Sequence, residues 1–204
     1  MEPRLVGGHV ALDLVNTVAP RVPGGVEYIG SPRELLAWAR RVDLLTTGEA
    51  GDALAEAGSA PGEAGLGAVI EIREATYAVL TAALAHREPP AAALATVSAH
   101  WAAAAGRSKL EPGGPDDPPV RLAVGADPAT RIQDRLAFAA LDLLQTVDLA
   151  RVRVCPLDEG GCGWLFLDRS RNASRRWCAM ADCGTQAKSR RLTARRRVAR
   201  AGGG

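Results

Sequence analysis

The sequence predicts a mostly α-helical fold with a small β component. We expect a helical N-terminal body over residues 1–150 and a small C-terminal module over residues 151–204. Three observations support this division. Apolar residues recur at helical spacing through most of the body, and all four cysteines fall in the last 50 residues. Charge is divided as well: 13 basic and 4 acidic residues give the module a formal +9, whereas 12 basic and 19 acidic residues give the body −7, for a total of +2.

The helices of the body are predicted from their caps and apolar spacing. Ser31-Pro32-Arg33-Glu34 is a capping box with proline at the first helical position, which predicts a helix from Ser31 to Arg41. The Ala- and Gly-rich stretch 48–67 predicts one short helix between loose connections. Longer helices are expected over residues 66–85 and 91–105.

The rest of the body combines strand and helix signals. Residues 109–111 and 120–124 flank a cluster of Gly, Pro and Asp, which predicts a small hairpin. Asp127-Pro128 then opens the last helix of the body. Trp38 and Trp101 lie on Ala-rich helices and are expected in the core.

The body shows no nucleophile paired with a base and no open metal site, so we expect that the protein is not an enzyme. Asp13, Asn16 and Thr17 are polar residues within or just after an apolar segment. Such residues usually hydrogen-bond the local backbone. The alternative is that they face a small-molecule pocket.

The four cysteines of the module are candidate metal ligands: Cys155, Cys162, Cys178 and Cys183. They form two close pairs separated by a segment long enough for a hairpin, as in a chain that folds around a tetrahedral Zn2+. Six residues separate the first pair, which favours zinc over iron. Four sulfur ligands leave no position for water, so we expect one structural Zn2+.

Two disulfides are the competing interpretation of these cysteines. They persist only in an oxidising compartment. The N-terminus has no signal-peptide pattern, and no apolar run approaches the length that spans a bilayer. We therefore expect a cytoplasmic location, no membrane partner and reduced thiols that a metal can hold.

The basic residues of the module fall in two groups. Residues 164–177 are predicted to form a hairpin with arginines near its tip, and residues 185–200 a helix with Thr185 as N-cap. Lys and Arg residues are spread around most of the circumference of that helix, so the helix has no apolar face that burial in a core would require. A treble-clef-like zinc finger has this layout: a knuckle that contains the first cysteine pair, then a hairpin, then a helix. The candidate nucleic-acid-binding residues are Arg169, Arg171, Arg175, Arg176, Lys188, Arg190, Arg191, Arg195, Arg196 and Arg197.

The run from Cys162 to Arg191, CGWLFLDRSRNASRRWCAMADCGTQAKSRR, resembles the CGNR zinc finger, a bacterial C-terminal module. Residues 11–17, ALDLVNT, are similar to the ABATE domain that usually precedes it. Such proteins are described as stress-induced transcription regulators, with DNA binding inferred from the basic finger. This chain has Thr185-Gln186 where the signature has Asn-Arg, so the position of the family's Arg carries no charge for a phosphate.

The function that we expect is transcription regulation by a protein that binds DNA mainly through phosphate contacts of its finger. The alternative is a zinc-stabilised module that binds a protein or RNA without sequence-specific DNA binding. A small-molecule effector of the body and a homodimer stay open as further partners.

Overall fold

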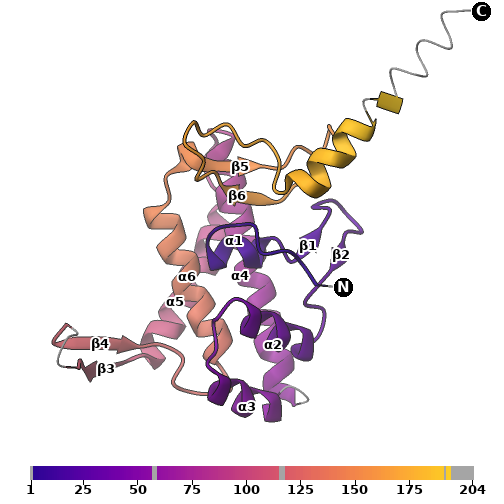
Figure 1. Cartoon of the computed structure of the whole chain (residues 1–204). Helices are drawn as coiled ribbons and strands as arrows, with labels where there is room; N and C mark the ends of the chain where they lie inside the picture. The colour runs from indigo at the N-terminus through magenta and orange to yellow at the C-terminus, as the bar shows by residue number, and fades with distance from the viewer. Residues whose placement is uncertain (1, 57–58, 115–117, 191, 194–204) are drawn as a thin grey trace, which may run out of the picture. The chain divides into compact units, whose positions relative to one another are not determined.

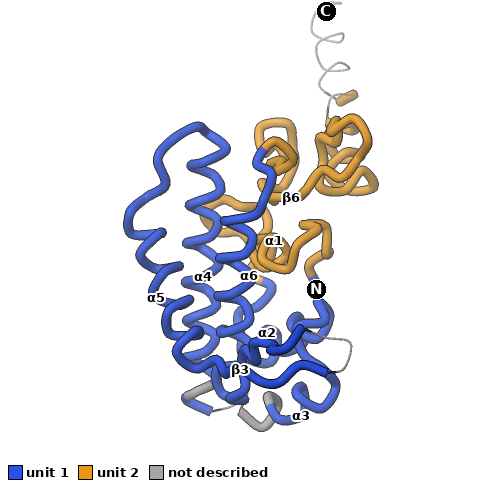
Figure 2. The backbone as a smooth tube through the Cα atoms, turned by 90° about the vertical axis from the view of Figure 1, so that its left-hand side faces the viewer, with its two compact units in different colours: residues 1–2, 28–149 blue, residues 3–27, 150–204 orange. Residues whose placement is uncertain are grey.

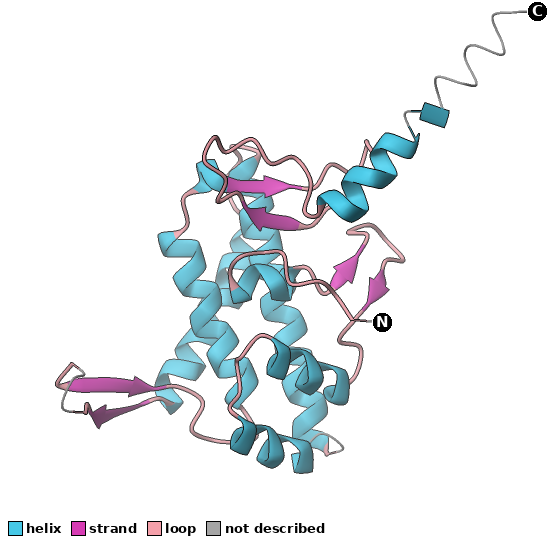
Figure 3. Cartoon of the chain, viewed as in Figure 1, coloured by secondary structure: helices cyan, strands magenta, loops and turns pink. Residues whose placement is uncertain are grey.

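The computed structural model of the chain describes residues 2–56, 59–114, 118–190 and 192–193. Helices dominate and the strands are few and short, which confirms the predicted fold class (Figure 3). Among the described residues, none of the helices has the length and apolar character needed to cross a membrane.

The chain folds into two compact units (Figure 2). The first consists mainly of Tyr28–Leu149, and the second combines Pro3–Glu27 with the residues from Ala150 onward. One division between the two units falls between Leu149 and Ala150. The predicted body, however, also contained residues 3–27, whereas in the structure this segment lies in the unit of the C-terminal module.

The first unit is helical. Its helices are α2 (Pro32–Arg41), α3 (Thr47–Glu56), α4 (Ala60–Leu84), α5 (Ala91–Arg107) and α6 (Arg131–Thr146). Helices α4, α5 and α6 pack side by side (Figure 1). Their contact surface is built from aliphatic residues such as Val69, Leu80, Val97 and Leu136, all of which are buried.

Helix α2 has the predicted cap. The Ser31 side chain accepts a hydrogen bond from the Glu34 backbone N–H at 3.3 Å, and its hydroxyl donates to the Glu34 carboxylate at 3.0 Å. Proline occupies the first turn. Trp38 is buried on the apolar face, as predicted.

The stretch 48–67 differs from its prediction of one short helix. It contains most of α3 and also the first turns of α4, which begins at Ala60. The Ser59 side chain accepts a hydrogen bond from the Gly62 backbone N–H at 3.3 Å, and proline follows within the first turn. This cap starts α4 earlier than apolar spacing alone indicated.

The predicted hairpin is present as β3 (Lys109–Pro112) and β4 (Val120–Ala123), which pair antiparallel. Helix α6 begins at Arg131 instead of Asp127, because the Asp127 carbonyl accepts from the Thr130 N–H in a turn. The prediction for Trp101 was wrong: its side chain lies on the exposed surface of α5.

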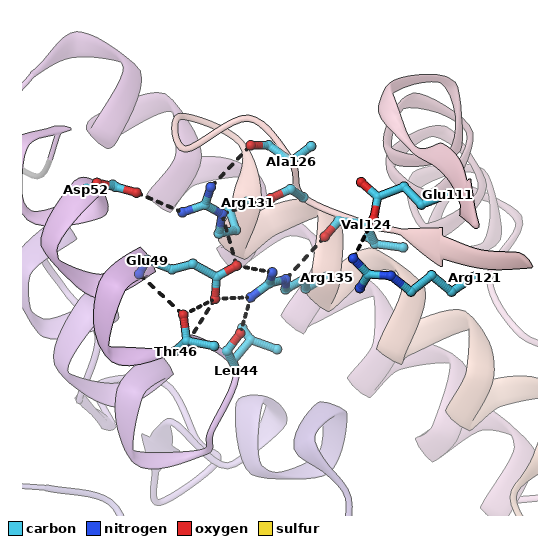
Figure 4. A network of polar contacts seen from close by, with 11 residues as sticks. Leu44, Thr46, Glu49, Asp52, Glu111, Arg121, Val124, Ala126, Arg131 and Arg135 are labelled. Carbon is cyan, nitrogen blue, oxygen red and sulfur yellow. Dashed lines mark hydrogen bonds and ion pairs between the residues drawn. The ribbon is translucent and has the colours of Figure 1, made fainter. Parts of the chain in front are cut away.

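Two arginines of α6 connect α6 to α3 and to the base of the β3–β4 hairpin (Figure 4). Arg135 forms a bidentate ion pair with Glu49 of α3. Its Nε also donates to a carbonyl in the segment 124–126 that follows β4, at 3.2 Å. Arg131 is buried and donates to two carbonyls of the same segment, at 2.8 and 3.1 Å.

The second unit contains short elements from both ends of the chain. Those from the N-terminal end are α1 (Val10–Val15), β1 (Val18–Ala19) and β2 (Val26–Glu27). Those from the C-terminal end are β5 (Val152–Val154), β6 (Leu165–Leu167) and the π-helical turn η2 (Met180–Gly184), with a 3-10 turn η1 (Leu149–Arg151) leading into β5.

The partner of β6 differs from the sequence prediction. Residues 164–167 were expected to pair with 175–177, but β6 pairs antiparallel with β5, with Val152 opposite Leu167. The segment after β6 is instead a loop that the buried carboxylate of Asp168 closes, since it accepts from the N–H groups of Ser170 and Arg175 at 2.9 and 2.7 Å.

Residues 3–27 pack against this hairpin, with α1 beside β6. Asn16 is fully buried and exchanges two hydrogen bonds with the Leu165 backbone. The indole N–H of Trp164 donates to the Val18 carbonyl at 2.7 Å. The N-terminal segment therefore supplies part of the structure that surrounds the cysteines.

Candidate metal centre

The four cysteine sulfurs come together in the second unit. All four Sγ atoms lie within 4.8 Å of one another. The Cys162 and Cys178 sulfurs are 3.4 Å apart, and those of Cys178 and Cys183 are 3.6 Å apart. Tetrahedral ligands at about 2.3 Å from Zn2+ would be separated by roughly 3.8 Å, so the cluster fits one ion. A disulfide needs about 2.05 Å and is not formed.

The first two cysteines lie on the loop between β5 and β6. The Cys155 N–H donates to the Trp164 carbonyl at 2.8 Å, and the Gly163 N–H donates to the Cys155 carbonyl at 3.0 Å, which closes the loop. A side chain at Gly161 would place its Cβ 2.6 Å from the Cys155 sulfur. Glycine at this position therefore allows the backbone to approach the sulfur cluster closely.

The other two cysteines come from the segment that leads into the C-terminal helix. Cys178 and Cys183 are buried, and Cys183 belongs to η2. Residues 185–190 continue from η2 as α-helix, so the helical segment begins before the predicted start. Thr185 is not an N-cap: its hydroxyl donates to the Met180 carbonyl at 3.1 Å.

The protonation of these thiols explains why a cation suits the cluster. In the metal-free protein, hydrogen bonds from Cys162 and Cys178 lower the pKa of Cys155 to about 2. Interaction with Cys155 raises the pKa of Cys178 far above its usual range, and burial raises that of Cys183. Four sulfurs this close together, three of them buried, cannot all be thiolates without compensating positive charge. A bound Zn2+ would supply it and release the protons.

Arg175 and Arg176 were predicted as phosphate contacts beside the metal site. The Arg175 guanidinium donates to the carbonyls of Trp177 and Cys178 and stacks over the Phe166 ring at 4.4 Å. It is therefore directed into the finger. Arg176 is exposed, but it forms an ion pair with Glu159.

The remaining predicted cations have different surroundings. Arg169 is exposed and donates to the Gly8 carbonyl at 2.6 Å. Arg171, Lys188 and Arg190 are exposed as well. Four of the predicted residues lie outside the described part of the chain: Arg191, Arg195, Arg196 and Arg197. Phosphate binding by this set stays a prediction.

Most acidic side chains of the module are occupied by contacts within the unit. Asp168 is buried and accepts from backbone N–H groups. Asp182 forms an ion pair with Arg4 at 2.6 Å, and Glu159 pairs with Arg176. Within the described residues, no ion pair is formed by Arg171, Lys188 or Arg190.

The three polar residues of the N-terminal segment have structural roles. The Thr17 hydroxyl donates to the Leu14 carbonyl, and Asp13 accepts from the Gly7 N–H, both at 2.8 Å, which confirms the prediction of local backbone contacts. Asn16 instead reaches Leu165, 149 positions away. This contact could not be predicted from the sequence, because no residue near Asn16 in the chain indicates that Leu165 is its partner.

The first unit contains a pocket of about 420 Å³. Its lining includes Glu49, Arg131 and Arg135 beneath the β3–β4 hairpin. These charges are paired with one another, as Figure 4 shows. The presence of a small-molecule effector stays a prediction.

A helical unit joined to a basic module with a four-cysteine metal site defines a zinc-finger protein of mostly helical structure. Residues 8–147 match the ABATE family, described as "Putative stress-induced transcription regulator", and residues 151–196 match the CGNR zinc finger. The chain belongs to the ABATE family. Its four cysteines form the site for one metal ion, consistent with a single structural Zn2+. A search among curated proteins finds no match.

Proposed function

We propose that this protein is a non-catalytic regulator whose zinc finger binds DNA through contacts with phosphates. The observation that carries the proposal is the set of exposed cations on the finger without acidic partners among the described residues: Arg171, Lys188 and Arg190. Phosphate groups are the ligand that such a surface attracts in a DNA-binding protein.

The distribution of acids supports this proposal. Three of the module's four acidic side chains bind groups within their own unit, where they organise the loop after β6 or pair with arginine. They therefore do little to repel an approaching polyanion. The metal site is joined to Lys188 and Arg190 through the short helix that follows Cys183, so zinc would fix where these cations lie.

The test is a fluorescence-anisotropy titration of duplex DNA over a series of salt concentrations. Each phosphate contact contributes roughly 0.9 to the slope of log K against log salt. The double variant Arg171→Ala/Lys188→Ala should bind more weakly and flatten the slope by roughly 1.8. Arg87→Ala is the matched control, because Arg87 is an exposed arginine of the first unit.

The same titration separates DNA binding from the alternative of a protein- or RNA-binding module. Zinc content is measured for every variant, so that loss of the finger is not mistaken for loss of contacts. If the double variant retains zinc and shows the same salt slope as the wild type, the proposal of DNA binding by these residues is wrong. Preference for single-stranded RNA over duplex DNA at equal salt would favour the alternative.

A further inference from the structure

The β3–β4 hairpin, called the arm below, has one face that is entirely apolar. Leu110 lies opposite Leu122 and Pro112 opposite Val120, so these four residues share a face, while Glu111 and Arg121 occupy the other. The exposed fractions are 72% for Leu110, 54% for Val120 and 49% for Leu122. A two-stranded hairpin is marginally stable in water by itself, so an uncovered apolar face needs an explanation.

The base of the arm is held firmly. Arg131 and Arg135 of α6 donate hydrogen bonds to the carbonyls of residues 124–126, directly after β4 (Figure 4). Arg135 is itself fixed by Glu49. On the polar face of the arm, Glu111 pairs with Arg121. These contacts set the direction of the arm and leave its apolar face outward, which lowers the cost of docking onto a partner.

A second apolar surface lies on α5. From Ala91 to Gly106 this helix contains no Asp, Glu, Lys or Arg. Leu94 and Trp101 are seven positions apart, which places them on one side of the helix, and they are 45% and 37% exposed. Small exposed residues flank them, which allows a partner to approach closely. Exposed tryptophan is enriched in protein interfaces.

We propose that the arm and the outer face of α5 form a homodimer interface. In this interface, the apolar face of each arm covers Leu94 and Trp101 of a second copy of the chain. Both surfaces are apolar: one is the face of the arm and the other is an alanine-rich helix. Both belong to the same chain. A two-fold axis therefore satisfies both at once, as in an isologous dimer.

The apolar face of the arm and residues 91–106 of α5 carry no Asp, Glu, Lys or Arg that could pair with a charged partner. Residues 28–149 carry 10 basic and 16 acidic side chains, a formal −6. The like net charge of two copies opposes their association, so apolar surface has to make the contact, and residues 91–106 of α5 supply such surface without Asp, Glu, Lys or Arg. Helix α5 is about 25 Å long, so Leu94, Trp101 and the small residues around them form an extended surface that the apolar face of the arm can cover.

The proposal is tested by sedimentation velocity of the full-length, zinc-loaded protein without DNA, which makes the result independent of the proposed function. The wild type should sediment as a dimer at micromolar concentration. Leu122→Glu and Trp101→Glu should each weaken association at least about tenfold, because each places a charge in the interface. Lys109→Glu is the control, since Lys109 is exposed on the other face of the same arm.

The docking mode is tested by photo-crosslinking from p-benzoylphenylalanine at position 122 in a mixture of 14N- and 15N-labelled protein. Mixed-isotope crosslinks to residues 91–106 are expected. A monomeric wild type, or a Lys109→Glu variant as weak as Leu122→Glu, would overturn the proposal. So would crosslinks confined to other segments. Circular dichroism melts of each variant show whether it is folded.

Discussion

The Asn16 side chain binds both backbone groups of Leu165: its Nδ2 donates to the carbonyl at 2.8 Å, and its Oδ1 accepts from the N–H at 3.0 Å. Asn16 thus takes the place of a neighbouring strand along β6. Both residues are fully buried, so water cannot replace these hydrogen bonds. The contact connects the N-terminal segment to the zinc-binding part of the chain.

Replacing Asn16 with Ala should therefore destabilise the second unit. The substitution leaves a buried N–H and a buried carbonyl without partners, which costs about 2–4 kcal/mol. We expect faster zinc release to a chromogenic chelator and a lower denaturation midpoint for the finger. Asn172→Ala, in the exposed loop after β6, is the matched control. Equal zinc release from both variants would contradict the role assigned to Asn16.

Removal of zinc should affect residues at both ends of the chain. Because residues 3–27 pack on β6 and its neighbours, they should lose hydrogen-exchange protection together with residues 150–190 when a chelator is added. Helices α4 to α6 have their own apolar core and should stay protected. Exchange measured by mass spectrometry distinguishes this from a change confined to residues after 150.

Arg175 and Arg171 should have separable roles although they lie four positions apart. Arg175→Ala removes hydrogen bonds to the Trp177 and Cys178 carbonyls and the stacking on Phe166. It should accelerate zinc loss. Arg171→Ala should leave the zinc site intact and weaken DNA binding only. Zinc release and DNA anisotropy, measured on both variants, check this. An Arg175→Ala protein with wild-type zinc retention and weakened DNA binding would reverse the assignment.

The ion pair between Glu49 and Arg135 should make the first unit sensitive to acid. Hydrogen bonds from Arg135 lower the pKa of Glu49 from 4.5 to about 2. Because the folded-state pKa is the lower one, the contribution is fully present above pH 4.5 and is lost as pH falls toward 2. Glu49 is partly exposed to solvent, so we expect only about 1 kcal/mol.

Glu49→Gln should therefore lower the unfolding free energy at pH 6 and converge with the wild type near pH 2. The measurement is denaturant unfolding of both proteins across this range, and their difference cancels the effect of acid on the cysteine site. Glu88→Gln, an exposed position of the first unit, is the control. A constant difference between Glu49→Gln and wild type down to pH 2 would contradict the assigned pKa.

Residues close together in the sequence were sufficient to predict much of the structure of this protein. The four ligands follow from cysteine spacing, and the α2 helix follows from the Ser31–Glu34 capping box. The hairpin of β3 and β4 follows from two short segments, residues 109–111 and 120–124, that flank a cluster of Gly, Pro and Asp. In each case the residues that decide the structure lie near one another in the chain, so their spacing carries the information.

Tertiary structure alone decided the partner of β6, the direction of Arg175, the exposure of Trp101 and the joining of residues 3–27 to the finger. Asn16 illustrates the physical reason. A buried amide must hydrogen-bond, but whether it binds its own backbone or one 149 positions away depends on which groups the folded chain brings within 3 Å. That choice depends on packing between distant segments, which the order of residues near Asn16 does not encode.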